Sequence, residues 1–521
     1  MRSLRATLAE APFTIDDVDA LARAPATLVV SEPARNTLAE GHAVVERHAA
    51  GDEPVYGLNT GLGANVAFRL DRDAIDDFQE QLVRARMIGV GEPLPEAVCR
   101  AALVVRCIGL SRGGAGVSPA LLDLLLAMVE RGVTPVIPRR GSIGAGDLGL
   151  AAHMAAVAIG RGEAWWDGSR MTGAAALAAA GLVPAELVGR DGHALCNTSS
   201  VSIAHGALTL VDAARSMLFS VHAAALACEG FAANLSMFDA RIAALRPAAR
   251  QEDAAALFRR LLGGSSLESV PARRLQDPLS FRCLAQILGV ALQALEDARR
   301  EVEVELAGTS DSPVVLSGGR MLSTANFHTP ALAFVFDSLA IANAHLAAAS
   351  FQRIARLLDP ALTGLPRYLS PVGGASAGYV PLQKLCASLV AEVRLGATPA
   401  SLEAMPVSDS VEDVAPQTPL AIGKLADQLE PLRLLSAAEA LVAAQVVDLR
   451  ERARLAAPTR RLYDALRSVV EPLGADREPA PDLERVVALA VDQQLLGDLA
   501  SSLDGLDLPF LPRHSAVESV R

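Results

Sequence analysis

Gly141-Ser142-Ile143-Gly144-Ala145-Gly146-Asp147-Leu148 is the stretch of this 521-residue chain that says most about its fold. Glycines on both sides of Ala145 predict a tight turn, and a helix is expected to start near Asp147. Backbone N–H groups in a turn that leads into a helix could form an anion hole. The stretch therefore marks a candidate site and not only a connection between two elements.

A second glycine-rich segment lies upstream, Tyr56-Gly57-Leu58-Asn59-Thr60-Gly61-Leu62-Gly63. Its glycines suit a strained loop close to a ligand. The chain has only four tyrosines, and Tyr56 lies inside this long motif, which favours a role in a site. Four more segments carry polar residues in short motifs: Ala194-Leu195-Cys196-Asn197-Thr198, Gln276-Asp277-Pro278-Leu279-Ser280-Phe281-Arg282-Cys283, Asn326-Phe327-His328 and Glu412-Asp413.

The six segments resemble motifs of the histidine and phenylalanine/tyrosine ammonia-lyase family, and they follow one another along the chain in the family's order. The resemblance covers roughly residues 30 to 460. It implies a mainly α fold, with a long central helical bundle of the ammonia-lyase/fumarase type, a loop-rich N-terminal head and minor β structure. In that family an Ala-Ser-Gly triplet cyclises to the electrophile 4-methylidene-imidazol-5-one (MIO). By resemblance, the catalytic residues are Tyr56, as the base, and the turn of Gly144, Ala145 and Gly146.

The resemblance also assigns residues that would bind the substrate. Asn197 would lie beside the electrophile, and Arg282 would hold the substrate carboxylate. Glu412 would face the substrate amine, and Phe327 would belong to the same pocket. The substrate would be a small amino acid or another small molecule with a carboxylate, and the resemblance implies a homotetramer whose active sites are assembled from several subunits.

Three departures from the family motifs fall at the expected site. No serine separates Ala145 from Gly146, so the residue that would supply the methylidene carbon is absent, and we expect no MIO and no other cofactor. Leu279 replaces a tyrosine that supports MIO. Arg86 stands where the family has a histidine or an aromatic residue that selects the substrate side chain. In a pocket, Arg86 would favour a substrate with an acidic or oxygen-rich substituent. Alternatively, Arg86 could lie on a helix surface or at an interface.

The other candidates also have structural interpretations, which the sequence leaves open. Tyr56 could simply be packed in a glycine-rich turn. Arg282 could form an ion pair with Asp277, because a buried arginine needs a partner. Asn197 could hold a turn together, and Glu412 could cap a helix or pair with a cation.

The composition narrows the class of protein further. Hydrophobic residues make up 51% of the chain but aromatic residues only 4%, which favours closely packed helices over β-sandwiches. The net charge of −12 argues against a nucleic-acid partner. The six cysteines show no metal-ligand spacing, so we expect reduced thiols, no metal site and a cytoplasmic protein. The first residues contain no apolar stretch of the kind that signal peptides have, so we expect no signal peptide. We interpret three histidines as structural: His153, His193 and His328.

Apolar residues with helical periodicity predict helices over 117–131, 328–358 and 419–456, and charged residues within 201–238 favour a core helix there over a membrane span. Short strands are expected at 26–30, 314–316 and 320–322, and a surface loop at 471–482. We expect one unit over 1–521, made of an N-terminal head (1–115), a central bundle (116–470) and C-terminal helices with a tail (471–521).

Three functional hypotheses follow. The first is an enzyme on the ammonia-lyase scaffold that eliminates, isomerises or cyclises without MIO. The second is an MIO-dependent amino acid ammonia-lyase or aminomutase, which would need a serine that the sequence does not contain. The third is a binding or assembly protein that has lost the reaction.

Overall fold

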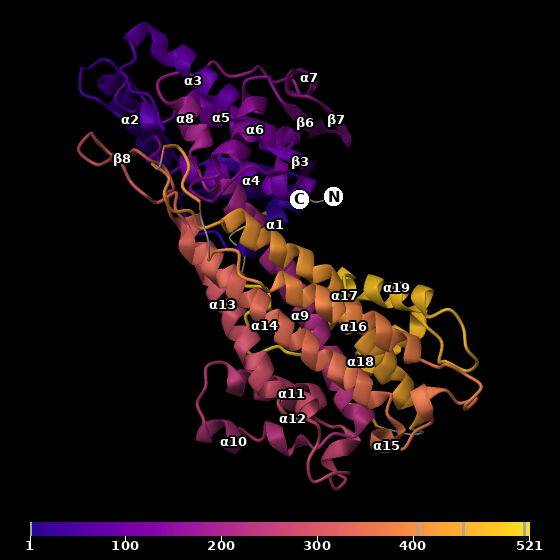
Figure 1. The fold of residues 1–521 in the computed structure, drawn as a ribbon. Coiled ribbons are helices and arrows are strands. Elements are labelled where there is room, and N and C mark those ends of the chain that lie inside the picture. The colour runs from indigo at the N-terminus through magenta and orange to yellow at the C-terminus, as the bar shows by residue number, and fades with distance from the viewer. Residues whose placement is uncertain (1–2, 403–404, 410, 451–453, 514–516, 521) are drawn as a thin grey trace.

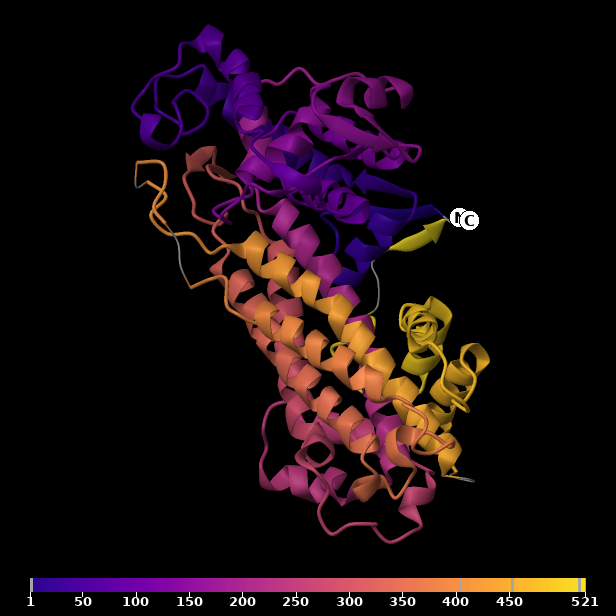
Figure 2. The same ribbon diagram turned by 45° about the vertical axis from the view of Figure 1, so that its right-hand side comes forward.

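Five long helices form the central bundle of the protein in the computed structural model, which describes residues 3–402, 405–409, 411–450, 454–513 and 517–520. They are α9 (Ser200–Phe231), α13 (Leu284–Ala307), α14 (Pro330–Leu357), α16 (Val380–Gly396) and α17 (Thr418–Leu449). Figures 1 and 2 show them side by side along one axis, with the N-terminal head at one end. The predicted mainly α fold with a long central bundle is confirmed.

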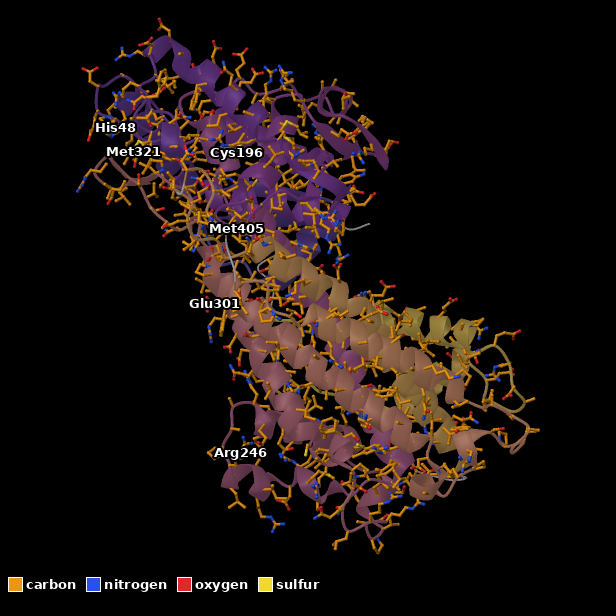
Figure 3. The ribbon with its side chains drawn as sticks, viewed as in Figure 1. His48, Cys196, Arg246, Glu301, Met321 and Met405 are labelled. Atoms are coloured by element: carbon orange, nitrogen blue, oxygen red, sulfur yellow. The ribbon has the colours of Figure 1, made fainter. Side chains whose placement is uncertain are left out.

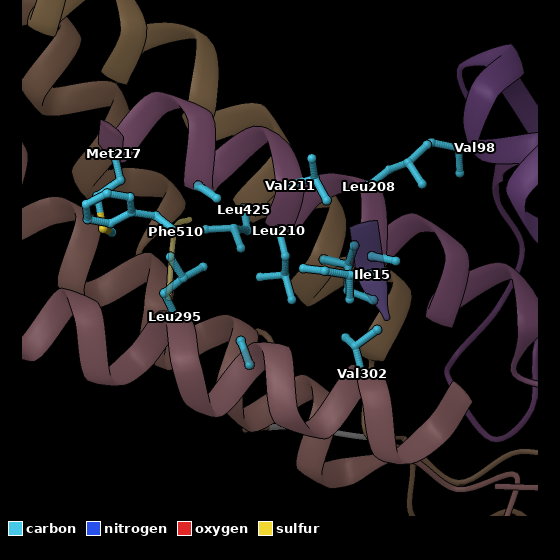
Figure 4. Packing of buried hydrophobic residues seen from close by; sticks show 14 of the residues in the cluster. Ile15, Val98, Leu208, Leu210, Val211, Met217, Leu295, Val302, Leu425 and Phe510 are labelled. Atoms are coloured by element: carbon cyan, nitrogen blue, oxygen red, sulfur yellow. The ribbon is translucent and has the colours of Figure 1, made fainter. Parts of the chain in front are cut away.

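The helix α9 is the centre of this bundle. Almost all of its side chains are buried, and it packs against α17, α4, α13 and α1. Its sequence is rich in alanine and leucine, so neighbouring helices can approach it closely on every side. Figure 4 shows part of the resulting core, in which Leu210 and Val211 of α9 lie between side chains from α1, α13 and α17.

The head is built from shorter helices and small sheets. Its helices are α1 (Ile15–Arg23), α2 (Glu32–Ala49), α3 (Ile75–Ala85), α4 (Glu96–Leu110), α5 (Pro119–Arg131), α6 (Leu148–Ala158), α7 (Gly173–Ala179) and α8 (Asp191–Cys196). One three-stranded sheet has β1 (Ser3–Leu8) in the middle. β1 is parallel to β2 (Ala26–Val30) on one side and antiparallel to β10 (Glu518–Val520) on the other. The other strands are β3 (Val90–Pro93) with β5 (Pro138–Arg140), β4 (Thr134–Pro135) with β6 (Glu163–Trp166) and β7 (Ser169–Thr172), and β8 (Val314–Leu316) with β9 (Arg320–Leu322).

Short helices cover the end of the bundle that is far from the head, and others cover its side (Figure 1). These are α10 (Ala240–Leu245), α11 (Gln251–Leu262), α12 (Leu279–Arg282), α15 (Pro360–Thr363), α18 (Ala457–Val469), α19 (Pro479–Leu489) and α20 (Gln493–Ser501). Single 3-10 turns occur at Gly63–Asn65, Arg72–Ala74, Leu235–Phe238, Ser266–Glu268 and Arg367–Leu369. In Figure 3, Arg246 marks the far end, and Cys196 and Met405 mark the head and its junction with the bundle.

The predicted elements can be compared with these bounds. The strands 26–30, 314–316 and 320–322 are present at those residues, and the four expected helices correspond to α5, α9, α14 and α17. The head continues past residue 115, because α5 to α8 and the strands around them pack mainly with α3, α4 and one another, although α6 also contacts α9 of the bundle. The loop expected at 471–482 is shorter, since α19 already begins at Pro479.

Two helical segments are long and apolar enough to cross a membrane by length and composition alone, Asp191–Phe231 and Pro330–Leu357. In the first, 83% of the most apolar window is buried inside the protein, and in the second 56%. Core helices of the kind expected here pass the same test.

Candidate active site

A cavity of about 960 Å³ lies where the head meets the bundle. Residues that are far apart in the sequence line it together, and they include six of the ten predicted site residues: Tyr56, Arg86, Ala145, Asn197, Phe327 and Glu412. Loops supply most of these side chains, while α3, α8 and the start of α6 hold the loops in place. The structure therefore gathers motifs from five separate segments around one space.

The turn at 141–148 forms one wall of the cavity. Gly144 and Gly146 have φ values of +83° and +72°, in the left-handed region that favours glycine. Ala145 between them is almost buried, lines the cavity and forms a β-bridge with His328. The N–H of Gly146 donates to the carbonyl oxygen of Phe327 at 2.9 Å. These contacts hold the turn against the 325–328 segment.

Asp147 stabilises the turn through the hydrogen bonds of its carboxylate. Its carboxylate accepts hydrogen bonds from the backbone N–H and the hydroxyl of Ser202, both at 2.7 Å, and from the hydroxyl of Ser142 at 3.4 Å. Burial raises the pKa of Asp147 to about 6, although these hydrogen bonds oppose the shift. Asp147 also ends the turn, because its backbone N–H donates to Thr198 and α6 begins at the next residue.

Tyr56 is half-buried at the cavity surface. Its phenol oxygen accepts a hydrogen bond from the N–H of Gly63 at 3.0 Å, within the same glycine-rich loop. Its ring meets His193 edge to face, with ring centroids 5.7 Å apart. Tyr56 is therefore both packed in a glycine-rich turn and part of the cavity wall.

Asn197 lies beside the turn, as the resemblance implied. Its amide nitrogen donates to the carbonyl oxygen of Ser312 at 2.9 Å. Its oxygen is so close to Gly146 that a side-chain carbon at that glycine would lie 3.2 Å from it. Phe327 lies next to the same turn, since its carbonyl oxygen accepts hydrogen bonds from the N–H of Gly146 and from the hydroxyl of Ser199.

Glu412 reaches the cavity from the loop between α16 and α17. Its carboxylate accepts a hydrogen bond from the hydroxyl of Ser408 at 2.6 Å, and it neither caps a helix nor pairs with a cation in the described part of this loop. Asp409 and Asp413 line the cavity beside it. This acidic side of the cavity suits a substrate ammonium group.

Arg86 follows the last residue of α3 and also lines the cavity. It is partly exposed, and no carboxylate lies within 4 Å of its guanidinium in the parts of the chain that the structure describes. Arg86 therefore lies both at the end of a helix and on the cavity wall.

Arg282 and Leu279 lie elsewhere. Both belong to α12, whose Phe281 stacks on Phe231, the last residue of α9, whereas Asn197 lies just before the first turn of that helix. A helix of 32 residues is about 48 Å long, so α12 and the cavity are at opposite ends of the bundle. Leu279 is 59% exposed. Within one chain, neither residue reaches the cavity.

The alternative left open for Arg282, an ion pair with Asp277, is absent from the described residues. Arg282 donates instead to the side chain of Gln276. Asp277 accepts from the backbone N–H of Asn234 at 2.6 Å and lies 4.0 Å from Arg274. The guanidinium of Arg282 therefore has no carboxylate partner in the described chain.

Two histidines that the sequence analysis interpreted as structural line the cavity, His193 and His328. His193 is buried, as expected, but its ring faces Tyr56 and not an apolar core. Its place next to the Ala194–Thr198 motif is the signal that could have identified it. His153 is a half-buried residue of α6 whose buried Nε2 atom has no hydrogen-bond partner in the described chain.

Within the described residues, no group of three or more His, Cys, Asp or Glu side chains could hold a metal ion. The six cysteines are all unpaired, and five of them are buried.

Comparison with known proteins identifies the family. The family model for aromatic amino acid lyases matches residues 13–468. Histidine ammonia-lyase from Symbiobacterium thermophilum is 37% identical over 489 residues, which are 93% of this chain and 96% of that protein. Two solved structures are similar over 96% of this chain: the ergothioneine-degrading ergothionase from Treponema denticola (TM-score 0.89, 28% identity, all of that chain) and histidine ammonia-lyase from Trypanosoma cruzi (TM-score 0.88, 28% identity, 95% of that chain).

These findings contradict the prediction that the protein has no prosthetic group, because the histidine ammonia-lyases belong to a family that uses MIO. The turn at 144–146 lies at the cavity, with left-handed glycines on both sides of Ala145, which lines it. Its residues do not supply the group, however, since Ala145 is bonded directly to Gly146 and no serine lies between them.

The family model and the relatives each cover most of the chain, and the cavity joins the family's motifs in space. The protein is an enzyme of the carbon–nitrogen lyase type. The chain belongs to the aromatic amino acid lyase family.

Proposed function

We propose that the protein eliminates the amino group from an α-amino acid with a histidine-like side chain and leaves an α,β-unsaturated acid. The observation that carries this proposal is the single cavity that joins Tyr56, Asn197 and Glu412 to the turn around Ala145. The identity to histidine ammonia-lyases favours a histidine-like substrate over other amino acids.

In this proposal Tyr56 removes the proton from the β-carbon, and the electrons form the double bond as the bond between the α-carbon and nitrogen breaks. Glu412 holds the departing ammonium group, with Asp409 and Asp413 beside it. Asn197 keeps the 144–146 turn and the substrate at a fixed spacing. A correctly placed general base contributes about 10²–10⁴-fold in rate.

Arg282 would bind the substrate carboxylate through two parallel hydrogen bonds. Because it lies at the far end of its own bundle, it can reach a cavity only on another subunit. Large apolar side chains are exposed along the bundle, among them Val290 (60%), Phe334 (68%) and Leu395 (76%), and they suit contacts between subunits. We therefore propose a homotetramer with shared active sites, located in the cytoplasm, where its unpaired cysteines stay reduced.

The test of the reaction is the ultraviolet absorbance of the conjugated product when purified protein is incubated with L-histidine. Absorbance should increase with release of one ammonia per product molecule. Absence of product from L-histidine and from a panel of other aromatic amino acids would refute the proposal. The intact mass of the denatured protein shows whether the turn contains MIO. A mass above that of the sequence by one serine residue minus two waters identifies MIO. A mass equal to that of the sequence means that the side chains of the cavity alone assist the departure of the amino group.

The test of shared sites is subunit complementation. Tyr56→Phe and Arg282→Ala should each be inactive alone, whereas mixed oligomers refolded or co-expressed from both chains should recover part of the activity, because some cavities then contain Tyr56 and Arg282 together. Light scattering should give the mass of four chains. A monomer, or mixtures that stay inactive, would refute the shared site.

A further inference from the structure

Gln79 of α3 lies behind the part of the cavity wall that contains Tyr56. Its side chain is completely buried, although glutamine is usually exposed in folded proteins. The side-chain oxygen accepts a hydrogen bond from the backbone N–H of His193 at 2.8 Å, and the side-chain nitrogen donates to the carbonyl oxygen of Gly57 at 3.3 Å. Because the first partner can only donate and the second can only accept, these contacts determine the orientation of the amide.

Gln79 thereby joins α8 to the loop of Tyr56. Figure 1 shows α3 and α8 side by side in the head, and Gly192 of α8 is so close that a side-chain carbon there would lie 2.3 Å from the carbonyl oxygen of Gln79. Gly57 approaches the ring of His193 in the same way, with 2.7 Å between such a carbon and Nδ1. Glycines at both contacts allow the three segments to meet without side chains between them.

The loop of Tyr56 has few other attachments to the head. Its backbone hydrogen bonds run within residues 53–70. In the described chain, the bond from Gln79 is the only hydrogen bond that joins residues 56–63 to a segment outside 53–70. Leu58 adds an apolar contact, since it is buried in a small hydrophobic cluster at the base of the loop. The place of the loop relative to α8 therefore depends on one buried amide.

Tyr56 depends on this attachment because Gly57 is the next residue of the chain. The ring of His193 meets the ring of Tyr56 edge to face, at an angle of 79°. Gln79 holds the backbone on both sides of this contact, at His193 and at Gly57. Removal of the amide would leave the loop free to shift relative to α8, and the phenol would move with it.

We propose that Gln79 is a positioning residue, which orients the Tyr56 phenol toward the substrate by holding its loop against α8. The proposal rests on the proposed function, in which Tyr56 is the base. Gln79 is not among the residues that line the cavity, so it acts through Gly57 and His193 and not on the substrate. A misplacement of about 1 Å can lower a rate by about 100-fold, because the reacting atoms must be aligned.

Gln79→Leu and Gln81→Leu are a matched pair of variants. Both residues belong to α3, but Gln79 is buried and Gln81 is exposed. Gln79→Leu should lower kcat for L-histidine at least about tenfold with little change in KM, because the lost contact orients a reacting group and does not bind the substrate. Gln81→Leu should leave both constants unchanged, and circular dichroism checks that both variants are folded.

Hydrogen exchange of backbone amides, read by mass spectrometry on the full-length protein, follows the loop without turnover. Peptides that cover residues 56–63 should exchange at least about tenfold faster in Gln79→Leu than in the wild-type protein, because the loop opens more often. Peptides from α9 should exchange at the wild-type rate, and Gln81→Leu should match the wild-type protein in both regions.

Gln79→Glu tests the same contact with a side chain of the same shape. A protonated carboxyl group can accept from His193 and donate to Gly57, whereas an ionised carboxylate cannot donate. The activity of Gln79→Glu relative to wild type should therefore increase as the pH falls, and that of Gln81→Glu should not.

A kcat of Gln79→Leu close to the wild-type value, or a relative activity of Gln79→Glu that is constant with pH, would overturn the proposal. Unchanged exchange of residues 56–63 in Gln79→Leu would refute only the positioning by Gln79. Absence of deamination by the wild-type protein, together with faster exchange of this loop in Gln79→Leu, would refute only the proposed function.

Discussion

Replacing Gly144 by alanine should disturb the cavity more than it disturbs the rest of the fold. Gly144 has a φ of +83°, and a side-chain carbon there would lie 2.8 Å from the backbone nitrogen of Thr418 and 3.1 Å from the ring of Pro416. Both neighbours are main chain or a rigid ring at the start of α17, so neither can move easily. The substitution must displace the 141–148 turn or the first residues of α17.

The size of the effect follows from two contributions. A residue other than glycine in the left-handed region costs about 1–2 kcal/mol, and the smaller entropy of the unfolded chain returns about 0.4–1 kcal/mol. Gly132, at the end of α5, has a φ of +74° and no atom within 4 Å of such a carbon, so Gly132→Ala measures this contribution alone. The clash at Gly144 adds about 1–3 kcal/mol.

The assay is thermal unfolding of both variants at one protein concentration, together with kcat/KM for the proposed deamination. Gly144→Ala should have the lower Tm and lose at least about tenfold in kcat/KM, because a displaced turn misplaces the reacting groups. Gly132→Ala should retain full activity with a small loss of Tm. Equal losses of Tm in the two variants, with activity retained in both, would show that the close approach of Thr418 to Gly144 has no consequence.

Three further predictions test other parts of the structure. Tyr56→Phe should lower kcat by about 10²–10⁴-fold with an unchanged circular dichroism spectrum, and a loss below threefold would exclude Tyr56 as the base. Burial raises the pKa of Asp147 to about 6 from 3.8, so the folded protein binds this proton more tightly and loses up to roughly 3 kcal/mol as the pH rises through that interval. The Tm of Asp147→Asn relative to wild type should therefore increase between these pH values and stay level above pH 7; a difference that is constant with pH would contradict the burial argument. Glu439→Gln breaks a fully buried ion pair with Arg353 (2.8 Å) and should cost about 3–5 kcal/mol, whereas Glu80→Gln breaks an exposed pair and should cost less than about 1 kcal/mol, which unfolding in denaturant can compare directly.

The motifs predicted much of the site because each is a local signal. Glycines around Ala145 and in the Tyr56 loop require special backbone conformations, and these occur where the sequence indicated. The apolar periodicity likewise predicted α14 and α17. Their assembly into one cavity followed only from the family resemblance, since nothing local in the sequence brings Glu412 close to Asn197.

What the sequence could not predict depends on contacts between distant segments. His193 has the surroundings of a core residue in the sequence, and only the packing of α8 against α3 turns its ring toward Tyr56. Arg282 belongs to a family motif, yet its helix lies at the other end of the bundle, and the chain runs back from there through the 24 residues of α13. The prediction of no prosthetic group rested on one missing residue, and it disagreed with the relatives that share most of the chain.

The pairing of β1 with β10 has a consequence for synthesis of the protein. β2 follows β1 closely and can pair with it early, but the other edge of β1 stays open until Glu518–Val520 has been translated. At synthesis rates of about 5–20 residues per second, this delay is roughly 25–100 s. For that time the nascent chain carries an unpaired strand edge that can bind other chains, so a chaperone or rapid folding of the head around β1 would protect it. Slower translation of the last part of the mRNA should therefore increase aggregation of the nascent chain, although the folded protein has this edge of β1 covered by β10.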